Sequence, residues 1–209
     1  FNESKSRGQW TGFSFKWYQE AFHNEQILSA LYNTILIAVL AAVIATIIGT
    51  IAAIGLQDLG KVSKYIALEV NYFPVINPDI VTGISLMLLF IFSKIELGFV
   101  TLLLAHISFC ISYVVLSVLP KLKQMDNNLY EAALDLGATP MYALRKVILP
   151  QIMPGVFTGM LLAFTLSLDD FVVSFFTTGN GVSNLSITIY NMVRRGVSPQ
   201  INAICTVMF

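Results

Sequence analysis

Three acidic side chains stand deep inside long apolar stretches of this chain, where a charge is costly. Asp79 lies in the stretch 65–92, and the pair Asp169 and Asp170 lies in the stretch 155–176. An acidic residue near the centre of a membrane-spanning helix costs about 2.5–3.5 kcal/mol on insertion scales, so it is by default a functional residue. Neither stretch contains a lysine or an arginine that could neutralise the charge. A bound cation is one interpretation, and protonation or an ion pair with a second subunit are the alternatives.

The depth of these carboxylates in their stretches predicts that they lie at similar heights. Asp79 and Asp169 each lie about fourteen residues into their stretches, which at 1.5 Å per residue is roughly 21 Å for both. Successive helical residues point about 100° apart, so Asp169 and Asp170 cannot face one point. We expect one of the pair to line a path and the other to bind a serine, the backbone or a neighbouring helix. Ser167 could hold a carboxylate or an amine by hydrogen bonding.

Aromatic and proline residues accompany the carboxylates. Ammonium groups are attracted to the faces of Trp and Tyr. The aromatic residues near the carboxylates, or just outside the first apolar stretch, are Trp17, Tyr18, Tyr72, Phe73 and Phe171. The alternative for each is an aromatic belt at the membrane surface. Pro74 and Pro78 predict a broken helix just before Asp79, which membranes tolerate where the broken helix lines a cavity.

The composition indicates a membrane protein. Of 209 residues, 56% are hydrophobic and 11% are charged, and the mean hydropathy is +0.75, whereas a soluble domain carries about 25% charged residues. Too few charged side chains remain to cover a soluble surface, which predicts an all-α, polytopic membrane protein. Basic and acidic residues balance at 12 each, which argues against the basic surface of a nucleic-acid-binding protein.

Several apolar stretches are long enough to cross a bilayer, which takes about 20 residues. The complete ones cover 27–56, 65–92, 99–119 and 155–176. A fifth stretch begins near Ile201 and is still apolar at Phe209, so we expect it to be cut short at this end. The basic residues divide evenly between the two sides of the membrane, so the positive-inside rule does not decide the orientation.

The cysteines and the histidine in these stretches are predicted to be packing residues. Cys110 and Cys205 have apolar neighbours and no C-x-x-C spacing, which favours a packing role. We expect His106 to hydrogen-bond a neighbouring helix, and a part in transport is the less favoured interpretation. The chain contains neither an intramembrane His–Glu zinc pattern nor a G-x-S-x-G motif, which argues against an intramembrane enzyme.

The long connector 120–154 predicts two short helices joined by a tight turn. Asn128 and Glu131 have the spacing of a capping box, with Asn128 as the N-cap. Alanines and leucines then continue the helix to Gly137, a natural C-terminal stop.

The second short helix has its own start and stop signals. Thr139 is expected as the N-cap, with Pro140 at the first helical position. We expect this helix to end at Leu149, before Pro150.

The same connector carries a motif. It reads Glu131-Ala-Ala-Leu-Asp-Leu-Gly137, then nine residues, then Val147-Ile-Leu-Pro150. This resembles the EAA loop of binding-protein-dependent ABC transporter permeases, with six of seven defined positions matched and Val147 in place of isoleucine. In that family the loop is a coupling helix that sits in a groove of a cytoplasmic ATPase subunit.

The resemblance implies coupling residues, partners and a cofactor arrangement. The matching residues expected to couple to an ATPase are Glu131, Ala132, Ala133, Gly137, Leu149 and Pro150. The implied partners are a second, related permease, two ATPase subunits, an extracytoplasmic binding protein and membrane lipid. No G-x-x-x-x-G-K-[ST] motif occurs in the chain, so we expect this chain to bind no cofactor and the partner ATPase to use ATP and Mg.

The resemblance covers nearly the whole chain and is strongest to the polyamine permeases of the family. The segments that carry it are 13–22, 77–80, 166–171 and 197–199. It implies a type I importer domain with six spans, of which the first would precede Phe1 and the last is truncated. The implied topology is an extracytoplasmic segment 1–26 and a transmembrane domain 27–209, with 120–154 in the cytoplasm and 93–98 and 177–200 outside.

These observations predict a non-catalytic, multi-pass permease subunit of a spermidine or putrescine importer in a bacterial cell membrane. Its predicted path residues are Trp17, Asp79, Ser167, Asp169 and Asp170, and Tyr18, Tyr72 and Phe171 are possible path aromatics. The nearest alternative is an ABC permease for an amino acid, thiamine or ferric ion. A proton-coupled secondary transporter is less favoured, because it would have no use for an ATPase-docking helix.

Overall fold

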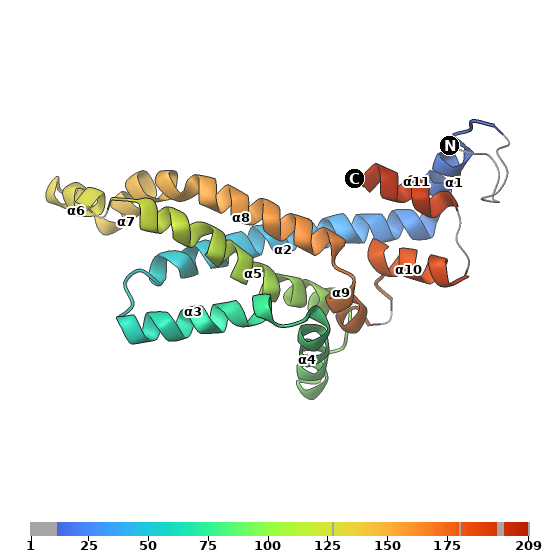
Figure 1. The fold of residues 1–209 in the computed structure, drawn as a ribbon, viewed down its shortest axis with the longest axis horizontal. Coiled ribbons are helices and arrows are strands. Elements are labelled where there is room, and N and C mark those ends of the chain that lie inside the picture. Colours follow the sequence, from blue (N-terminus) through green and yellow to red (C-terminus); the bar gives the residue numbers. More distant parts are fainter. Residues whose placement is uncertain (1–11, 127, 180, 196–198, 209) are drawn as a thin grey trace.

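A computed structural model describes residues 12–126, 128–179, 181–195 and 199–208, and these are almost entirely helical, with no β-strand among them (Figure 1). This confirms the predicted all-α class. The helices, in chain order, are α1 (Lys16–His23), α2 (Glu25–Gly55), α3 (Lys61–Ile76), α4 (Asp79–Phe92), α5 (Phe99–Gln124), α6 (Asn128–Asp135), α7 (Pro140–Ala143), the π-helical turn η1 (Leu144–Ile148), α8 (Leu149–Asp169), α9 (Val172–Thr177), α10 (Leu185–Arg195) and α11 (Pro199–Met208).

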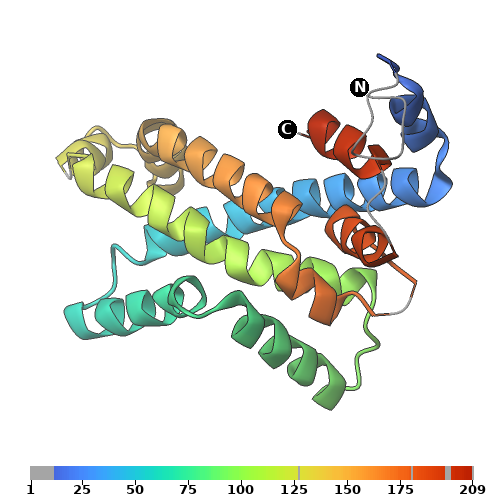
Figure 2. The ribbon, with the colours of Figure 1, turned by 45° about the vertical axis from the view of Figure 1, so that its right-hand side comes forward.

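Three long helices, α2, α5 and α8, pack along one another and form the core of the molecule (Figures 1 and 2). Each is long and apolar enough to cross a membrane, α8 being continuous with α7 and η1 from Pro140 to Asp169. The buried face of α2 consists of small residues such as Ala38, Ala41 and Ala45. Small side chains let helices approach closely, and close packing is the main attraction between helices in lipid.

Glycines on α8 set the distance between α8 and α5. Gly155 and Gly159 have the G-x-x-x-G spacing that places both on one face of the helix. A Cβ added at Gly155 would lie 2.9 Å from the carbonyl oxygen of Ser117, and one at Gly159 would lie 3.1 Å from Val114 Cα. The backbone of α5 therefore lies where a side chain on α8 would otherwise stand.

The second predicted span is broken into α3 and α4, which meet at 107°. The expected single stretch 65–92 is therefore two helices, and the break falls where the prolines predicted it. Pro74 is accommodated inside α3, whereas Asn77 and Pro78 are both extended, with ψ of 142° and 138°. A residue that precedes proline is disfavoured in the helical region, which explains the end of α3 at Ile76.

The fourth predicted span is also broken, which the sequence analysis did not anticipate. The stretch 155–176 was expected to be one helix, but α8 ends at Asp169 and α9 begins at Val172. Asp170 is extended at the break, with ψ of 124°. No proline or glycine lies at this position. Instead, the carboxylate of Asp170 accepts hydrogen bonds from two amides of α9, which holds the start of that helix.

The turn between the two short helices of the connector is confirmed. Gly137 has φ of +85°, the left-handed conformation that glycine adopts without strain. The amide of Gly137 donates to Leu134 O and the amide of Ala138 donates to Ala133 O, which is the Schellman arrangement. Thr139 caps α7 as predicted, because its side chain accepts from the amide of Tyr142.

Two details of the predicted connector are wrong. Asn128 is the first residue of α6 rather than its N-cap, and its own amide donates to Asp126 Oδ1. The second helix does not stop before Pro150 but continues into α8 through η1. Proline cannot donate to a preceding carbonyl, and the wider π turn, which ends at Ile148 just ahead of Pro150, accommodates this.

The connectors gather in two groups at opposite ends of the bundle. Residues of the 57–64 connector and of α6 and α7 line one shared cleft. At the other end, Thr101 Oγ1, at the start of α5, donates to Thr177 O at the end of α9. The helix α11 begins at Pro199, close to the predicted start at Ile201, and packs on α1. This grouping agrees with the alternation of sides expected for successive spans.

The close approach of α5 and α8 gives a test of the packing. Gly155→Ala should lower the unfolding free energy by about 1–3 kcal/mol, because the new Cβ meets backbone that cannot move cheaply. Gly55→Ala is the matched control, because a Cβ there meets nothing within 4 Å. Thermal unfolding of the detergent-solubilised protein measures both variants. Equal melting temperatures for the two variants would contradict this account of the helix contact.

Candidate functional site

The two helix breaks border one cleft. Its walls come from α3, α4, α5 and the α8–α9 junction, and its volume is about 360 Å³. None of the described residues that line it is basic. The lining residues are Pro74, Asp79, Thr82, Phe109, Tyr113, Thr165, Leu166, Asp169, Asp170, Phe171, Val172 and Val173.

Asp79 enters this cleft from the first residue of α4 and is exposed. A carboxylate in the first turn of a helix is stabilised by the positive end of the helix dipole. The break at Pro78 therefore both turns the chain and places a stabilised negative charge at the cleft. Asp79 lies just after the break that ends α3, and Asp169 is the last residue of α8 before the second break, so each carboxylate lies at a break that borders the cleft.

Asp169 and Asp170 have different environments, as their adjacent positions on a helix predicted. Asp170 accepts two hydrogen bonds, from the amide of Val173 to Oδ1 at 3.2 Å and from the amide of Ser174 to Oδ2 at 2.7 Å. It therefore caps α9, although it also borders the cleft. Asp169 is exposed at the cleft. Asp169 is thus the carboxylate of the pair that is free for a ligand in this arrangement.

Ser167 does not face the cleft, which differs from the predicted path position. Its side chain is 2% exposed and its Oγ lies 2.6 Å from His106 Nδ1. The same imidazole has Nε2 3.0 Å from Ser174 Oγ and 3.5 Å from Asp170 Oδ2. The predicted hydrogen bond from His106 to a neighbouring helix is confirmed, and it reaches both sides of the α8–α9 break.

The aromatic wall of the cleft is partly the predicted one. Phe171 lines the cleft, and its ring centroid lies 4.9 Å from that of Tyr190 on α10. Tyr72 does not line the cleft. Phe109 and Tyr113 on α5 line the cleft, and neither was predicted from the sequence. Their spacing of three and seven residues from His106 could have indicated one shared helix face.

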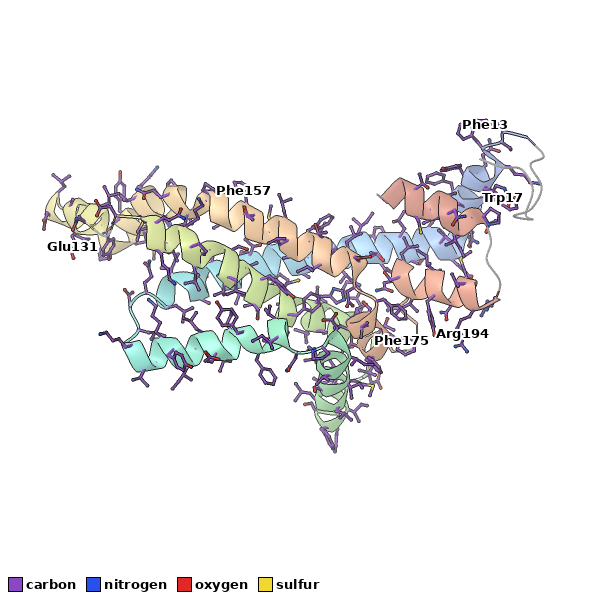
Figure 3. All side chains as sticks on the ribbon, viewed as in Figure 1. Phe13, Trp17, Glu131, Phe157, Phe175 and Arg194 are labelled. Atoms are coloured by element: carbon purple, nitrogen blue, oxygen red, sulfur yellow. The ribbon has the colours of Figure 1, made fainter. Side chains whose placement is uncertain are left out.

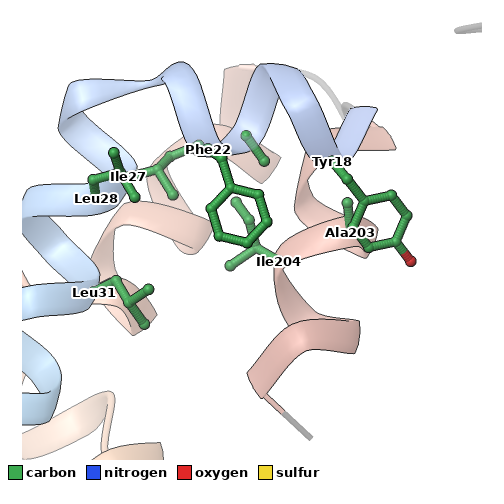
Figure 4. Close-up of a pocket in the computed structure, with 8 residues that line it drawn as sticks. Tyr18, Phe22, Ile27, Leu28, Leu31, Ala203 and Ile204 are labelled. Carbon is green, nitrogen blue, oxygen red and sulfur yellow. The ribbon is translucent and has the colours of Figure 1, made fainter. Parts of the chain in front are cut away.

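Two predicted aromatics lie away from the cleft. Trp17 is on α1, beside α11 and at the end of the molecule opposite Glu131 (Figure 3). Tyr18 lies against Ala203 of α11 in a small apolar pocket between α1, α2 and α11 (Figure 4). That pocket measures about 20 Å³, which is close to the room of one water molecule. Within this chain Tyr18 is a packing residue.

The motif residues of the connector form an exposed surface at the far end of the bundle. Glu131, Ala132 and Gly137 are exposed, and Glu131 lines an adjacent cleft of about 750 Å³ together with Asp58. Leu136 at the tip is 90% exposed. The turn between α6 and α7 therefore presents an apolar side chain at its surface.

Leu149 and Pro150 occupy a different position from the rest of the motif. Leu149 is the first residue of α8, directly after the π turn, and packs beside the core of α2, α5 and α8. The motif therefore begins on an exposed helix and ends at the base of a long helix whose far end carries Asp169. One continuous helical segment, from Pro140 to Asp169, joins the two regions.

Comparison with known proteins identifies relatives over the full length of the chain. Residues 45–208 match the family described as binding-protein-dependent transport system inner membrane component. The spermidine/putrescine transport system permease protein PotC of Escherichia coli K12 is 43% identical over 208 residues, covering 100% of this chain and 79% of that protein. PotC of Haemophilus influenzae is 41% identical, with 81% of that protein covered. The putrescine transport system permease protein PotI of Escherichia coli K12 is 40% identical over 216 residues, with 76% covered.

Solved structures support the fold independently. A bacterial ABC transporter involved in the import of the acidic polysaccharide alginate matches with a TM-score of 0.76, covering 96% of this chain and 79% of that chain at 15% identity. An amino acid ABC transporter matches with a TM-score of 0.67, covering 94% and 91% at 18% identity. At such identities the likeness shows the fold alone. Together with the family match, it shows that this chain belongs to the binding-protein-dependent inner membrane transport components and is a multi-pass permease of a bacterial membrane.

Proposed function

We propose that this permease carries polyamines, and that the cleft between α4, α5 and the α8–α9 break is part of their path. The observation that carries the proposal is a cleft in which Asp79 and Asp169 are both exposed while no described lining residue is basic. A cation of matching charge would neutralise the two carboxylates, so that each would form an ion pair instead of remaining an unpaired charge within the membrane. The names of relatives above 40% identity favour spermidine and putrescine as the cations.

The chemistry of the wall suits a linear diamine. Two carboxylates from different helices, Asp79 on α4 and Asp169 on α8, line the cleft, and each can take one ammonium group by a charge-assisted hydrogen bond. In the same cleft, Phe171 and Val172 offer apolar surface for methylene groups, and Tyr113 adds an aromatic face. A cleft of about 360 Å³ lies in the range of small-molecule sites. Trp17 would meet the substrate nearer the outer end, where a binding protein delivers it.

The exposed motif surface is proposed to couple the path to a separate ATPase. Glu131 can pair with a basic groove, Ala132 and Ala133 allow close approach, and the fixed turn at Gly137 transmits force. Connector 120–154 would then lie in the cytoplasm, with 1–26, 93–98 and 177–200 outside. Of these, residues 1–11, 127, 180 and 196–198 lie outside the described part of the chain.

The proposed assembly is a complex of several chains. This chain would pair with a second permease, two ATPase subunits and an extracytoplasmic polyamine-binding protein. ATP and Mg would be bound by the ATPases, and this chain would take no part in the chemistry. Closure of the ATPases would move α6 and α7, and the continuous helix from Pro140 to Asp169 would carry that movement to the cleft.

The carboxylates give the first test of this proposal. Asp79→Asn and Asp169→Asn should each lower uptake of labelled putrescine at least about tenfold, since each removes one charged partner of a desolvated ammonium. Glu69→Gln is the matched control, because Glu69 is an exposed acidic residue of α3 that does not line the cleft. Unchanged uptake in both asparagine variants, with ATPase activity intact, would overturn the site assignment.

The coupling surface gives the second test. Leu136→Asp should abolish co-purification of the ATPase subunit and ATP-dependent uptake, because a charge replaces the most exposed apolar side chain of the turn. Leu59→Asp is the control, because Leu59 is an exposed apolar residue of the neighbouring 57–64 connector. Uptake that persists without an ATPase and collapses when the proton gradient is dissipated would instead indicate a secondary transporter.

A further inference from the structure

A buried polar cluster lies beside the cleft, and of its members only Asp170 also lines the cleft. Its members are His106 on α5, Ser167 in the last turn of α8, and Asp170 and Ser174 across the break. His106 is 1% exposed, Ser167 is 2% exposed and Ser174 is fully buried. An ionisable side chain at such a place in a membrane protein is costly to bury, which calls for a specific role.

Through His106, helix α5 contacts both sides of the break, α8 and α9. Nδ1 of His106 reaches Ser167, before the break, at 2.6 Å, and Nε2 reaches Ser174, after the break, at 3.0 Å. Because the Asp170 carboxylate near Nε2 can only accept, this arrangement favours the tautomer with the proton on Nε2, so that Nδ1 accepts from the Ser167 hydroxyl. One imidazole then satisfies groups on both helices at once.

We propose that His106 is a positioning residue for the path: it fixes the bend between α8 and α9 and thereby directs Asp169 toward Asp79. This inference rests on the proposed function of the cleft, since it assigns His106 to the same site. Nε2 of the ring lies near both the fully buried Ser174 and the capping carboxylate of Asp170, and Asp169 directly precedes Asp170 in the chain. His106 does not itself line the cleft, so its effect on the substrate is exerted through its contacts at the break.

The inference predicts a change in apparent affinity rather than in maximal rate. In the assembled transporter, His106→Leu should raise the KM for putrescine about tenfold and leave the maximal rate per transporter nearly unchanged, as expected when binding alone is weakened. His106→Gln should restore most of the affinity, since its amide can bond Ser174. Ser112→Ala is the matched control, because Ser112 is a buried polar residue of α5 that contacts neither break. A loss confined to protein yield or maximal rate, with KM unchanged, would overturn the proposal.

A second readout does not depend on the cargo. In the assembled transporter with Cys110 and Cys205 replaced by alanine, cysteines are placed at Asp79 and Asp169 and cross-linked with a short bis-methanethiosulfonate. The cross-linking rate should fall about tenfold with His106→Leu and recover with His106→Gln. If the His106→Leu protein does not accumulate, Ser174→Ala should also lower the cross-linking rate, but to a smaller degree. Equal cross-linking rates in all variants would contradict the positioning role, whereas failure of wild-type putrescine uptake alone would refute only the proposed cargo.

Discussion

A helix that breaks inside an apolar segment leaves amide and carbonyl groups that need partners other than water. This constraint governs the site of the present chain, because both of its breaks lie in apolar stretches of the sequence, 65–92 and 155–176. At the first break, proline removes one of the amides, and the extended conformation of Asn77 follows from the proline after it. At the second break, the carboxylate of Asp170 accepts from two amides of α9. The chain thus uses polar groups as structural parts and places an exposed carboxylate beside each break, Asp79 at the first and Asp169 at the second.

The division of work between neighbouring carboxylates follows from the same constraint. The carboxylate of Asp170 already accepts hydrogen bonds from the backbone and lies beside His106, so it has a structural role. Asp169 and Asp79 are exposed and line the cleft. On the proposed function, the fixed, capped Asp170 holds the helix ends at the break, while the exposed Asp169 is available to a cation.

The sequence was sufficient for much of this organisation and insufficient for one essential part. Proline marked the first break, the depth of Asp79 and Asp169 predicted a common height, and the stop at Gly137 and the cap at Thr139 were correct. The second break carries no proline or glycine, and the side chain that contacts both of its sides, His106, lies on another helix, so local sequence patterns could not reveal it. The continuation of the helix through Pro150 was missed because a π turn before it compensates for the absent amide. The separation of Trp17 from the cleft is likewise a consequence of tertiary packing, of α1 on α11.

The central claim is that the acidic cleft at the two helix breaks holds a polyamine. The most direct measurement is a structure of the assembled transporter with putrescine bound. The account predicts the two ammonium groups within hydrogen-bonding distance, about 3 Å, of the carboxylates of Asp79 and Asp169, with the methylene chain against Phe171. Putrescine bound elsewhere, with both carboxylates paired to a basic residue of another subunit, would contradict it.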